Sequence, residues 1–223
     1  MPPMDPMSAR AFAAALRTQL ASPLPGRAYQ ELMLPAARRS ELDPPSTSNS
    51  AVLLALLGAR SEPSLLLIER GAGGPHGGQF AFPGGKEEAG DGGPVGTALR
   101  EAQEEIGLDP GEVEVLGLLT PLVVKVSAFF VRPVVGFVAG SPALAANRDE
   151  VAAILEIPLE QLTRPECRGE REVLARGERL LAPCYVFGET LVWGATAMML
   201  REFEELLIRS GALRPAQRPR LPR

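Results

Sequence analysis

The sequence predicts an α/β fold in which a mixed sheet carries helices on both faces. Three features indicate it: short apolar runs that suit buried strands, a central amphipathic helix with an acidic face, and a second amphipathic helix near the end of the chain. With 223 residues, the chain has room for one sizeable hydrophobic core but not for two. We therefore expect a single main domain.

The N-terminal region is predicted to form a helix and a connector. Helical periodicity runs from Ser8 to Leu20, with Ser8 as the expected N-cap. The following stretch, 23–50, is rich in Pro and Ser and is typical of an extended connector. We divide the chain into this N-terminal part (1–49), a main domain (50–210) and a basic, Pro-rich tail (211–223) that we expect to be solvated.

Apolar runs place the remaining elements in order. Strands are predicted at 51–57 and 64–68, and, after the central helix, at 113–119, 122–130 and 131–138. A short helix is expected at 158–163, and a hairpin over 180–187 and 190–193 that turns at Gly188-Glu189. The chain closes with a helix over 195–208. Its apolar stripe comprises Met198, Met199, Phe203, Leu206 and Leu207.

The central helix carries the most informative pattern. At about 100° per residue, Glu101, Glu104 and Glu105 fall within an arc of roughly 100°. Pro94 suits the helix start and Gly107 suits a stop that tolerates positive φ. The apolar residues lie on a separate arc that should face the core: Val95, Ala98, Leu99, Ala102 and Ile106.

Three clustered carboxylates repel one another unless cations neutralise them, and oxygen ligands of this kind suit Mg²⁺ or Mn²⁺. Arg100 stands beside them, where it could pair with a carboxylate or steady a phosphate. Glutamates at this spacing alone are more often a solvated helix face. The preceding turn, Phe82-Pro83-Gly84-Gly85, favours a metal-assisted phosphate site instead.

The combined segment resembles the signature of the Nudix hydrolases, G-x5-E-x7-R-E-U-x-E-E-x-G-U, in which U is bulky and apolar. The residues that match are Arg100, Glu101, Ala102, Glu104, Glu105, Gly107 and Leu108. Gly85 precedes Arg100 by one residue more than the general signature has, and Asp91 stands in place of the upstream glutamate. This longer spacing is similar to that of the coenzyme A pyrophosphatase branch of the family.

A second motif of that branch, roughly L-L-T-x-R-S-x3-R-x3-G-x3-F-P-G-G, is similar to the segment from Leu66 to Gly85. Its second half matches well. In its first half, Ile68 replaces Thr, Gly71 replaces Ser, and Gly74 stands where the motif has a second Arg. The loss of this arginine weakens the coenzyme A assignment but not the enzyme class.

The resemblance implies roles for particular residues. Glu101, Glu104 and Glu105 would hold the metal, with the carbonyl of Gly85 completing its shell. Glu150 would be a further ligand or a base that activates water, or else a surface acid before a strand. Arg100 would be part of the catalytic group. The implied substrate contacts are Arg70, His76, Gly78, Gln79, Phe82 and Gly84; His76, the single histidine, could instead be merely solvated.

The implied fold is the Nudix α/β/α sandwich with a mixed sheet, which makes 50–210 the Nudix hydrolase domain. The implied reaction is hydrolysis of the pyrophosphate of coenzyme A or acyl-CoA to 3',5'-ADP and (acyl-)4'-phosphopantetheine, with Mg²⁺ or Mn²⁺. A Nudix pyrophosphatase that acts on ADP-ribose, NADH or another nucleoside diphosphate derivative is the alternative enzyme. A noncatalytic nucleotide sensor and a protein that only presents an acidic helix remain as other classes.

Composition limits the classes of partner that we expect the protein to bind. A net charge of −4 argues against nucleic-acid binding, and no apolar run approaches the length of a membrane span. Cys167 and Cys184 have neither metal-site spacing nor a disulfide framework, so we expect reduced thiols and a cytoplasmic protein. The expected partner is a small nucleotide substrate, and a homodimer is compatible with this interpretation.

Overall fold

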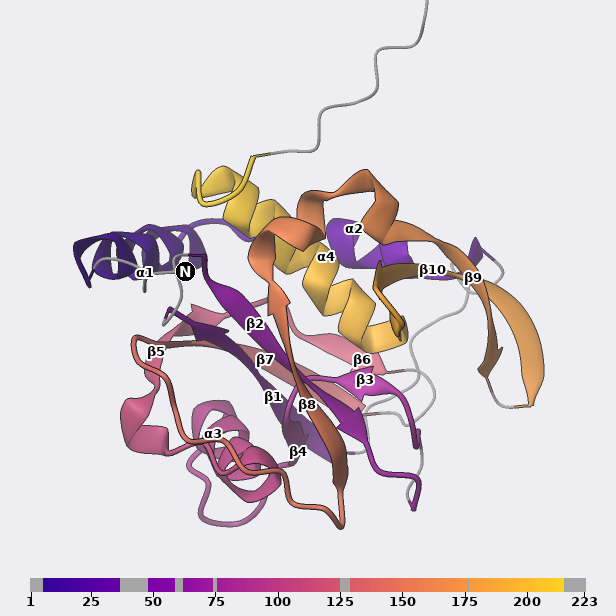
Figure 1. Cartoon of the computed structure of the whole chain (residues 1–223), viewed down its shortest axis with the longest axis horizontal. Helices are drawn as coiled ribbons and strands as arrows, with labels where there is room; N and C mark the ends of the chain where they lie inside the picture. Colours follow the sequence, from indigo (N-terminus) through magenta and orange to yellow (C-terminus); the bar gives the residue numbers. More distant parts are fainter. Residues whose placement is uncertain are drawn as a thin grey trace, which may run out of the picture.

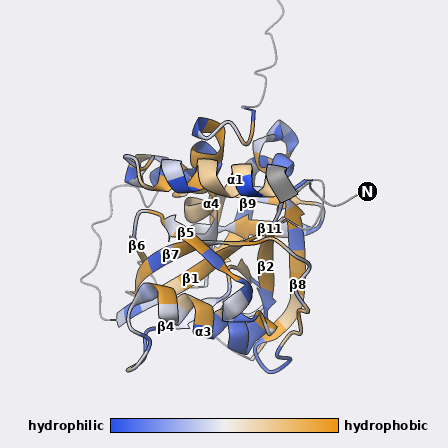
Figure 2. Ribbon diagram, turned by 90° about the vertical axis from the view of Figure 1, so that its left-hand side faces the viewer, coloured by the Kyte–Doolittle hydropathy of each residue, from blue (hydrophilic) through white to orange (hydrophobic). Residues whose placement is uncertain are grey.

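The computed structural model describes residues 6–36, 48–58, 62–73, 76–124, 129–175 and 177–214. A mixed sheet lies between helix α3 (Pro94–Ile106) on one face and helices α1 (Pro6–Leu20) and α4 (Gly194–Arg209) on the other (Figure 1). Apolar residues concentrate in the sheet and on the helix faces turned toward it (Figure 2). The α/β class and the helices on both faces are confirmed.

The main sheet is built around β1 (Ser48–Leu57), which pairs in parallel with β7 (Phe129–Val138) along its whole length. The strands that pair antiparallel with one of these two are β2 (Ser64–Arg70), β4 (Gly84–Lys86), β5 (Glu114–Leu118) and β6 (Leu122–Val124). The short β3 (Phe80–Ala81) and β8 (Val151–Pro158) pair antiparallel with β2.

β1 is apolar from Ala51 to Leu57 because both of its faces are buried there. Leu54 and Leu56 pack in the core beneath α1 and α4, whereas Leu53 and Ala55 pack in the core beneath α3. Successive side chains of a strand point to opposite faces, so a strand covered on both sides has no polar alternation. This double burial explains the continuous run that predicted the strand.

A second sheet comprises β9 (Arg168–Ala175), β10 (Glu178–Phe187) and β11 (Thr190–Trp193). The predicted β10–β11 hairpin is confirmed, with Gly188 at φ 62° in its turn. β9 was not predicted because its polar, mostly exposed sequence lacks an apolar pattern. The β9–β10 hairpin extends away from the body of the molecule (Figure 1).

The N-terminal prediction needs two corrections. Ser8 lies inside α1, which begins at Pro6, so it is not the N-cap. The supposed extended connector contains α2 (Arg27–Gln30) and the 3₁₀ helix η1 (Glu31–Met33), both packed against α4. Buried polar contacts with distant residues hold this segment, and a local sequence pattern does not report them.

Smaller differences concern element ends. Phe129 and Phe130 begin β7 rather than continuing the preceding strand. The short predicted helix is the 3₁₀ helix η4 (Leu159–Thr163), and two further 3₁₀ turns are η3 (Pro110–Glu112) and η5 (Pro165–Cys167). Gly74 and all but the first few residues of the predicted tail lie outside the described residues. Within the described part, no helix is long and apolar enough to cross a membrane.

Candidate active site

Helix α3 positions the predicted acidic group. Pro94 occupies its first turn, and Gly107 ends it at φ 69°. Its inward face is fully buried against β1 and β7 through Ala98, Ala102 and Ile106. With that face fixed by packing, the glutamates of α3 lie toward β4 and its glycine turn. The predicted bounds and orientation of this helix are therefore confirmed.

The three glutamates of α3 lie in three different environments. The exposed fraction is 55% for the Glu104 side chain, 15% for the Glu101 side chain and 3% for Glu105. The Gly84 amide donates a hydrogen bond to Oε2 of Glu105 at 2.9 Å. The group therefore runs from a buried carboxylate beside the glycine turn to one in contact with water.

Burial raises the pKa of Glu105 to about 7. The Gly84 amide and the charge of Arg70 oppose this rise in pKa, and the charges of Glu101 and Glu150 add to it. Burial likewise raises the pKa of Glu101, against the opposing effect of Arg100. Arg70 and Glu150, both predicted site residues, therefore act electrostatically on the buried carboxylates.

Arg100 is the centre of a hydrogen-bond network rather than a free cation. Its Nε donates to Oδ1 of Asp91 at 2.9 Å, and its Nη2 donates to the carbonyl of Lys86 at 3.0 Å. Nη2 also donates to Oε1 of Glu101 at 3.0 Å, while Nη1 donates to Oε2 of Glu104 at 2.9 Å. In this geometry the guanidinium orients the acidic side chains.

Asp91 anchors the network from the loop before α3. Its Oδ2 accepts hydrogen bonds from the hydroxyl of Thr97 and from the amide of Glu88, both at 2.9 Å. The Arg100 guanidinium, followed by the Glu88 amide, holds the pKa of Asp91 well below its usual range, and Asp91 in turn raises the pKa of Arg100. The aspartate of the longer motif therefore fixes the start of α3 to Arg100.

Gly84 and Gly85 must lack side chains because other atoms lie where their Cβ atoms would be. A Cβ on Gly85 would overlap the carboxylate of Glu101, and a Cβ on Gly84 would overlap the carbonyl of Ala51 in β1. The two collisions differ in kind, since one is with the end of a side chain and the other with the backbone. The bare Cα of Gly85 allows the Glu101 carboxylate to rest against β4.

The donor set suits a hard divalent cation. The carboxylate of Glu101 rests against Gly85 and that of Glu105 against the Gly84 amide, so two sets of oxygen ligands lie at the glycine turn. Within the described ranges, however, no three acidic, His or Cys side chains already converge in metal-binding geometry. The Glu104 and Glu101 carboxylates instead accept hydrogen bonds from the Arg100 guanidinium.

The predicted substrate contacts gather at the end of β2. The amide of Arg70 donates to the carbonyl of Gln79 at 3.0 Å, and the Gly78 amide donates back to the Arg70 carbonyl at 2.8 Å. His76 is exposed at φ 71°, in the left-handed region. Nearby, the Gly71 amide donates to the carbonyl of Glu150 at 2.7 Å, which brings Glu150 to this loop.

Phe82 differs from the other predicted contacts. It is 1% exposed and packs in the core beneath α1 and α4. We correct its role from substrate contact to support of the glycine turn.

An ion pair between Arg132 of β7 and Glu87, just after β4, was not among the predicted site residues. The strand register sets Gly85, Ala51 and Arg132 in one row across β4, β1 and β7. Nε of Arg132 is buried and has no hydrogen-bond partner among the residues that the structure describes. A charged residue inside an otherwise apolar strand was the signal available in the sequence.

Comparison with known proteins gives consistent results. A model of the NUDIX domain matches residues 47–177. An uncharacterized Nudix hydrolase, NudL, of Citrobacter koseri is 39% identical over 154 residues, which cover 69% of this chain and 79% of the relative. NudL of Cronobacter sakazakii is 38% identical over 173 residues, covering 77% of this chain and 88% of the relative.

Among solved structures, a Nudix hydrolase from M. smegmatis, RenU, aligns with 86% of this chain and 98% of its own, at 16% identity and a TM-score of 0.49. The family match covers most of the chain, and it coincides with the sheet, the glycine turn and the acidic helix described above. The chain therefore belongs to the Nudix family and is a Nudix pyrophosphohydrolase, an enzyme that acts on nucleoside diphosphate derivatives.

Proposed function

We propose that this enzyme hydrolyses the pyrophosphate bond of coenzyme A or acyl-CoA, giving 3',5'-ADP and (acyl-)4'-phosphopantetheine. The observation that carries the proposal is the longer spacing from Gly85 to Arg100, with Asp91 inside it. The carboxylate of Asp91 accepts hydrogen bonds from Arg100, from Thr97 and from the amide of Glu88. The aspartate of the longer motif is therefore part of an ordered network, which supports the resemblance to the coenzyme A branch.

In this proposal Glu101, Glu104 and Glu105 hold Mg²⁺ or Mn²⁺ together with the carbonyl of Gly85. A bound divalent ion would neutralise the pyrophosphate and lower the pKa of an attacking water. Arg100 orients the exposed Glu104 and the more buried Glu101 along α3 through its hydrogen bonds to both carboxylates. Such an arrangement aligns water and phosphorus without any covalent nucleophile.

Glu150 is the residue we propose as the base or as a further ligand. Its charge adds to the rise in the pKa of both Glu101 and Glu105, and the residue itself is exposed. An exposed carboxylate at the edge of the site can exchange protons with solvent after each turnover. This supports a proton-accepting role rather than a purely structural one.

The substrate would lie across the loop at the end of β2. Arg70 and the exposed His76 could pair with phosphate oxygens, and Gly78, Gln79 and Gly84 offer close backbone approach. Arg70 acts electrostatically on Glu105, so a phosphate bound by Arg70 would be near the carboxylates.

We further propose that residues 50–210 are the catalytic domain, that 1–49 support it, and that 211–223 form a solvated tail. The two buried, free thiols of Cys167 and Cys184 support a cytoplasmic location. A homodimer is the assembly to test, by light scattering on the full chain.

The direct experiment is hydrolysis of coenzyme A, ADP-ribose and NADH by the purified protein with Mg²⁺ or Mn²⁺, with products identified by mass. We expect selective release of 3',5'-ADP from coenzyme A. The arginine replaced by Gly74 favours the alternative substrates, and preference for ADP-ribose or NADH would replace the coenzyme A assignment. No turnover of any of them would favour the nucleotide sensor.

A further inference from the structure

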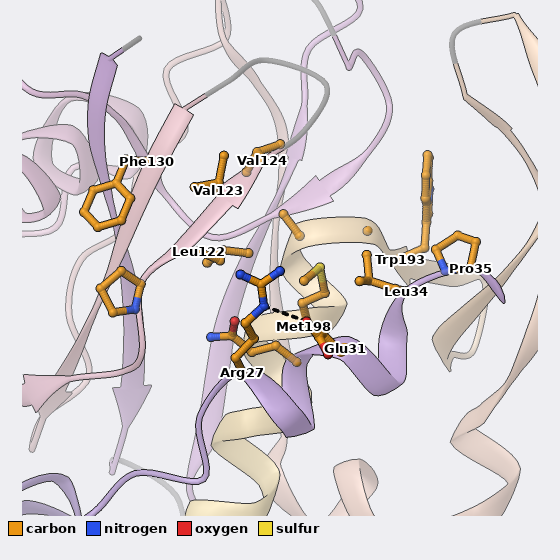
Figure 3. A pocket seen from close by; sticks show the side chains of 14 residues that line it. Arg27, Glu31, Leu34, Pro35, Leu122, Val123, Val124, Phe130, Trp193 and Met198 are labelled. Carbon is orange, nitrogen blue, oxygen red and sulfur yellow. Dashed lines mark hydrogen bonds and ion pairs between the residues drawn. The ribbon is translucent and has the colours of Figure 1, made fainter. Parts of the chain in front are cut away.

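A pocket of about 230 Å³ lies at the edge strand β6 (Figure 3), and no residue of α3 is among those that line it. Its walls come from the docked N-terminal segment (Leu34, Pro35), from β6 (Leu122, Val124) and from the start of α4 (Met198). The lining is mainly apolar, and it also includes the exposed ion pair between Arg27 and Glu31. A smaller apolar cavity, of about 150 Å³, is sufficient to bind benzene.

Two of the three walls lie outside residues 47–177, the part that matches the family model. A buried carboxylate, Glu202 of α4, holds the N-terminal wall in place. It accepts hydrogen bonds from the Gly26 amide at 3.1 Å and from Nε2 of Gln30 at 2.7 Å. It also accepts one from the Thr120 amide at 3.2 Å, just before β6. One side chain therefore fixes all three walls, so the pocket is preformed.

Strand register connects the pocket to the acidic site. Phe130 lines the pocket, and Arg132, two residues along β7, shares a row with Gly85 two strands away. Two strand spacings of about 4.8 Å and two residue steps of about 3.3 Å separate Gly85 from Phe130 by about 12 Å in the plane of the sheet. The pocket is therefore within reach of a short, flexible chain.

The pocket can also be entered without crossing the sheet. Val123 pairs with Phe130, so these two side chains share one face of the sheet, and Leu122 and Val124 lie on the opposite face. All four residues line the pocket. The lining therefore includes residues from both faces of the sheet at the β6 edge, which would let a chain that starts on the α3 face enter the pocket.

We propose that this pocket receives the acyl group of an acyl-CoA whose pyrophosphate lies at α3. The inference rests on the proposed function and specifies its substrate. About twelve bonds join the pyrophosphate oxygen to the sulfur in the pantetheine arm. Three bonds of an extended chain span at most about 3.6 Å, so the arm reaches about 14 Å. This length places the sulfur at the pocket and the acyl chain inside it.

The test compares coenzyme A with its acetyl, butyryl and hexanoyl esters. Because burial of each methylene stabilises the complex, kcat/KM should rise by up to about fourfold per added methylene, mainly through a lower KM. Met198→Trp should fill the pocket and remove this chain-length dependence while coenzyme A turnover stays within about twofold. Met198→Leu, which nearly conserves volume, is the matched control and should keep the dependence.

Val124→Trp fills the opposite wall and provides a second test, with circular dichroism to confirm that each variant folds. Equal kcat/KM for all esters in the wild type would overturn the acyl site while leaving coenzyme A hydrolysis intact. Persistence of the chain-length dependence in both tryptophan variants would overturn it as well. If no coenzyme A compound is hydrolysed, the proposed function fails and the acyl site fails with it.

Discussion

Helices α3 and α4 carry nearly the same acidic sequence and use it in opposite ways. α3 contains Arg100-Glu101 and then Glu104-Glu105, and α4 contains Arg201-Glu202 and then Glu204-Glu205. In α4, the buried Glu202 and Glu204 accept hydrogen bonds from residues of distant segments of the chain. In α3, the acids lie beside one another with fewer donors, next to a glycine turn. An Arg-Glu pair followed by two adjacent glutamates on a helix therefore does not by itself identify a metal site.

The donors around α4 explain its structural role. Glu202 is fully buried and accepts hydrogen bonds from Gly26, Gln30 and Thr120. Glu204 accepts one from the hydroxyl of Tyr185 at 2.6 Å, and burial together with this carboxylate raises the pKa of Tyr185 well above its usual range. In α3, by contrast, burial raises the pKa of Glu105 and mutual repulsion adds to the rise. A cation would relieve that repulsion.

The largest stability effect should come from Glu202→Ala. Removal of the carboxylate leaves the Gly26 and Thr120 amides without their acceptor and takes one of the two acceptors from Nε2 of Gln30, which should lower the free energy of unfolding by about 4 kcal/mol. Urea unfolding measures this. Molecules that remain folded should keep the wild-type kcat for coenzyme A, and a fall in kcat with unchanged stability would contradict the structural role.

The two glycines of the turn should separate stability from activity. Gly85→Ala should lower kcat at least about 100-fold, because the new Cβ displaces the carboxylate of Glu101. Gly84→Ala should instead lower the melting temperature, because its Cβ meets the backbone of β1. Kinetics and thermal unfolding on both variants check this. Equal effects of the two substitutions on melting temperature would contradict the distinction.

The raised pKa of Glu105 predicts how stability depends on pH. The carboxyl has a pKa of about 7 in the folded protein, against 4.5 ordinarily, so the folded form holds the extra proton between these values. With EDTA present, stability should therefore fall by about 2 kcal/mol as the pH rises from 4.5 to 7. Urea titrations at several pH values measure it. Glu105→Gln should remove most of this loss of stability. If the stability of the variant depends on pH as strongly as that of the wild type, Glu105 is not the source of the dependence.

The smallest effect should come from Asp91→Asn. The amide can still accept hydrogen bonds, but it loses the charge that holds Arg100, so the glutamates should be less well oriented. We expect about a tenfold loss of kcat/KM with little change in stability. Thr97→Val removes one donor to Asp91 and keeps its charge, which makes it the milder control. A larger loss of kcat/KM in Thr97→Val than in Asp91→Asn would contradict the role assigned to the charge of Asp91.

Local sequence was sufficient for the elements whose pattern is set by burial. The apolar runs predicted β1 and β7, and the bounds of α3 followed from Pro94 and Gly107. Local sequence was insufficient where polar contacts between distant residues determine the structure. The docked segment from Arg27 to Met33 depends on Glu202, which is far away in the chain. Likewise, the engagement of Arg100 by Asp91 required the folded loop before it could be recognised.

The most direct measurement compares Glu104→Gln with Glu205→Gln in coenzyme A hydrolysis. Both glutamates form an i,i+4 ion pair with an arginine on a helix, Glu104 with Arg100 and Glu205 with Arg209. If α3 is the catalytic helix, Glu104→Gln should lower kcat at least about 100-fold while Glu205→Gln stays within about twofold of the wild type. Metal-dependent turnover retained by Glu104→Gln would contradict the assignment of α3 as the active site.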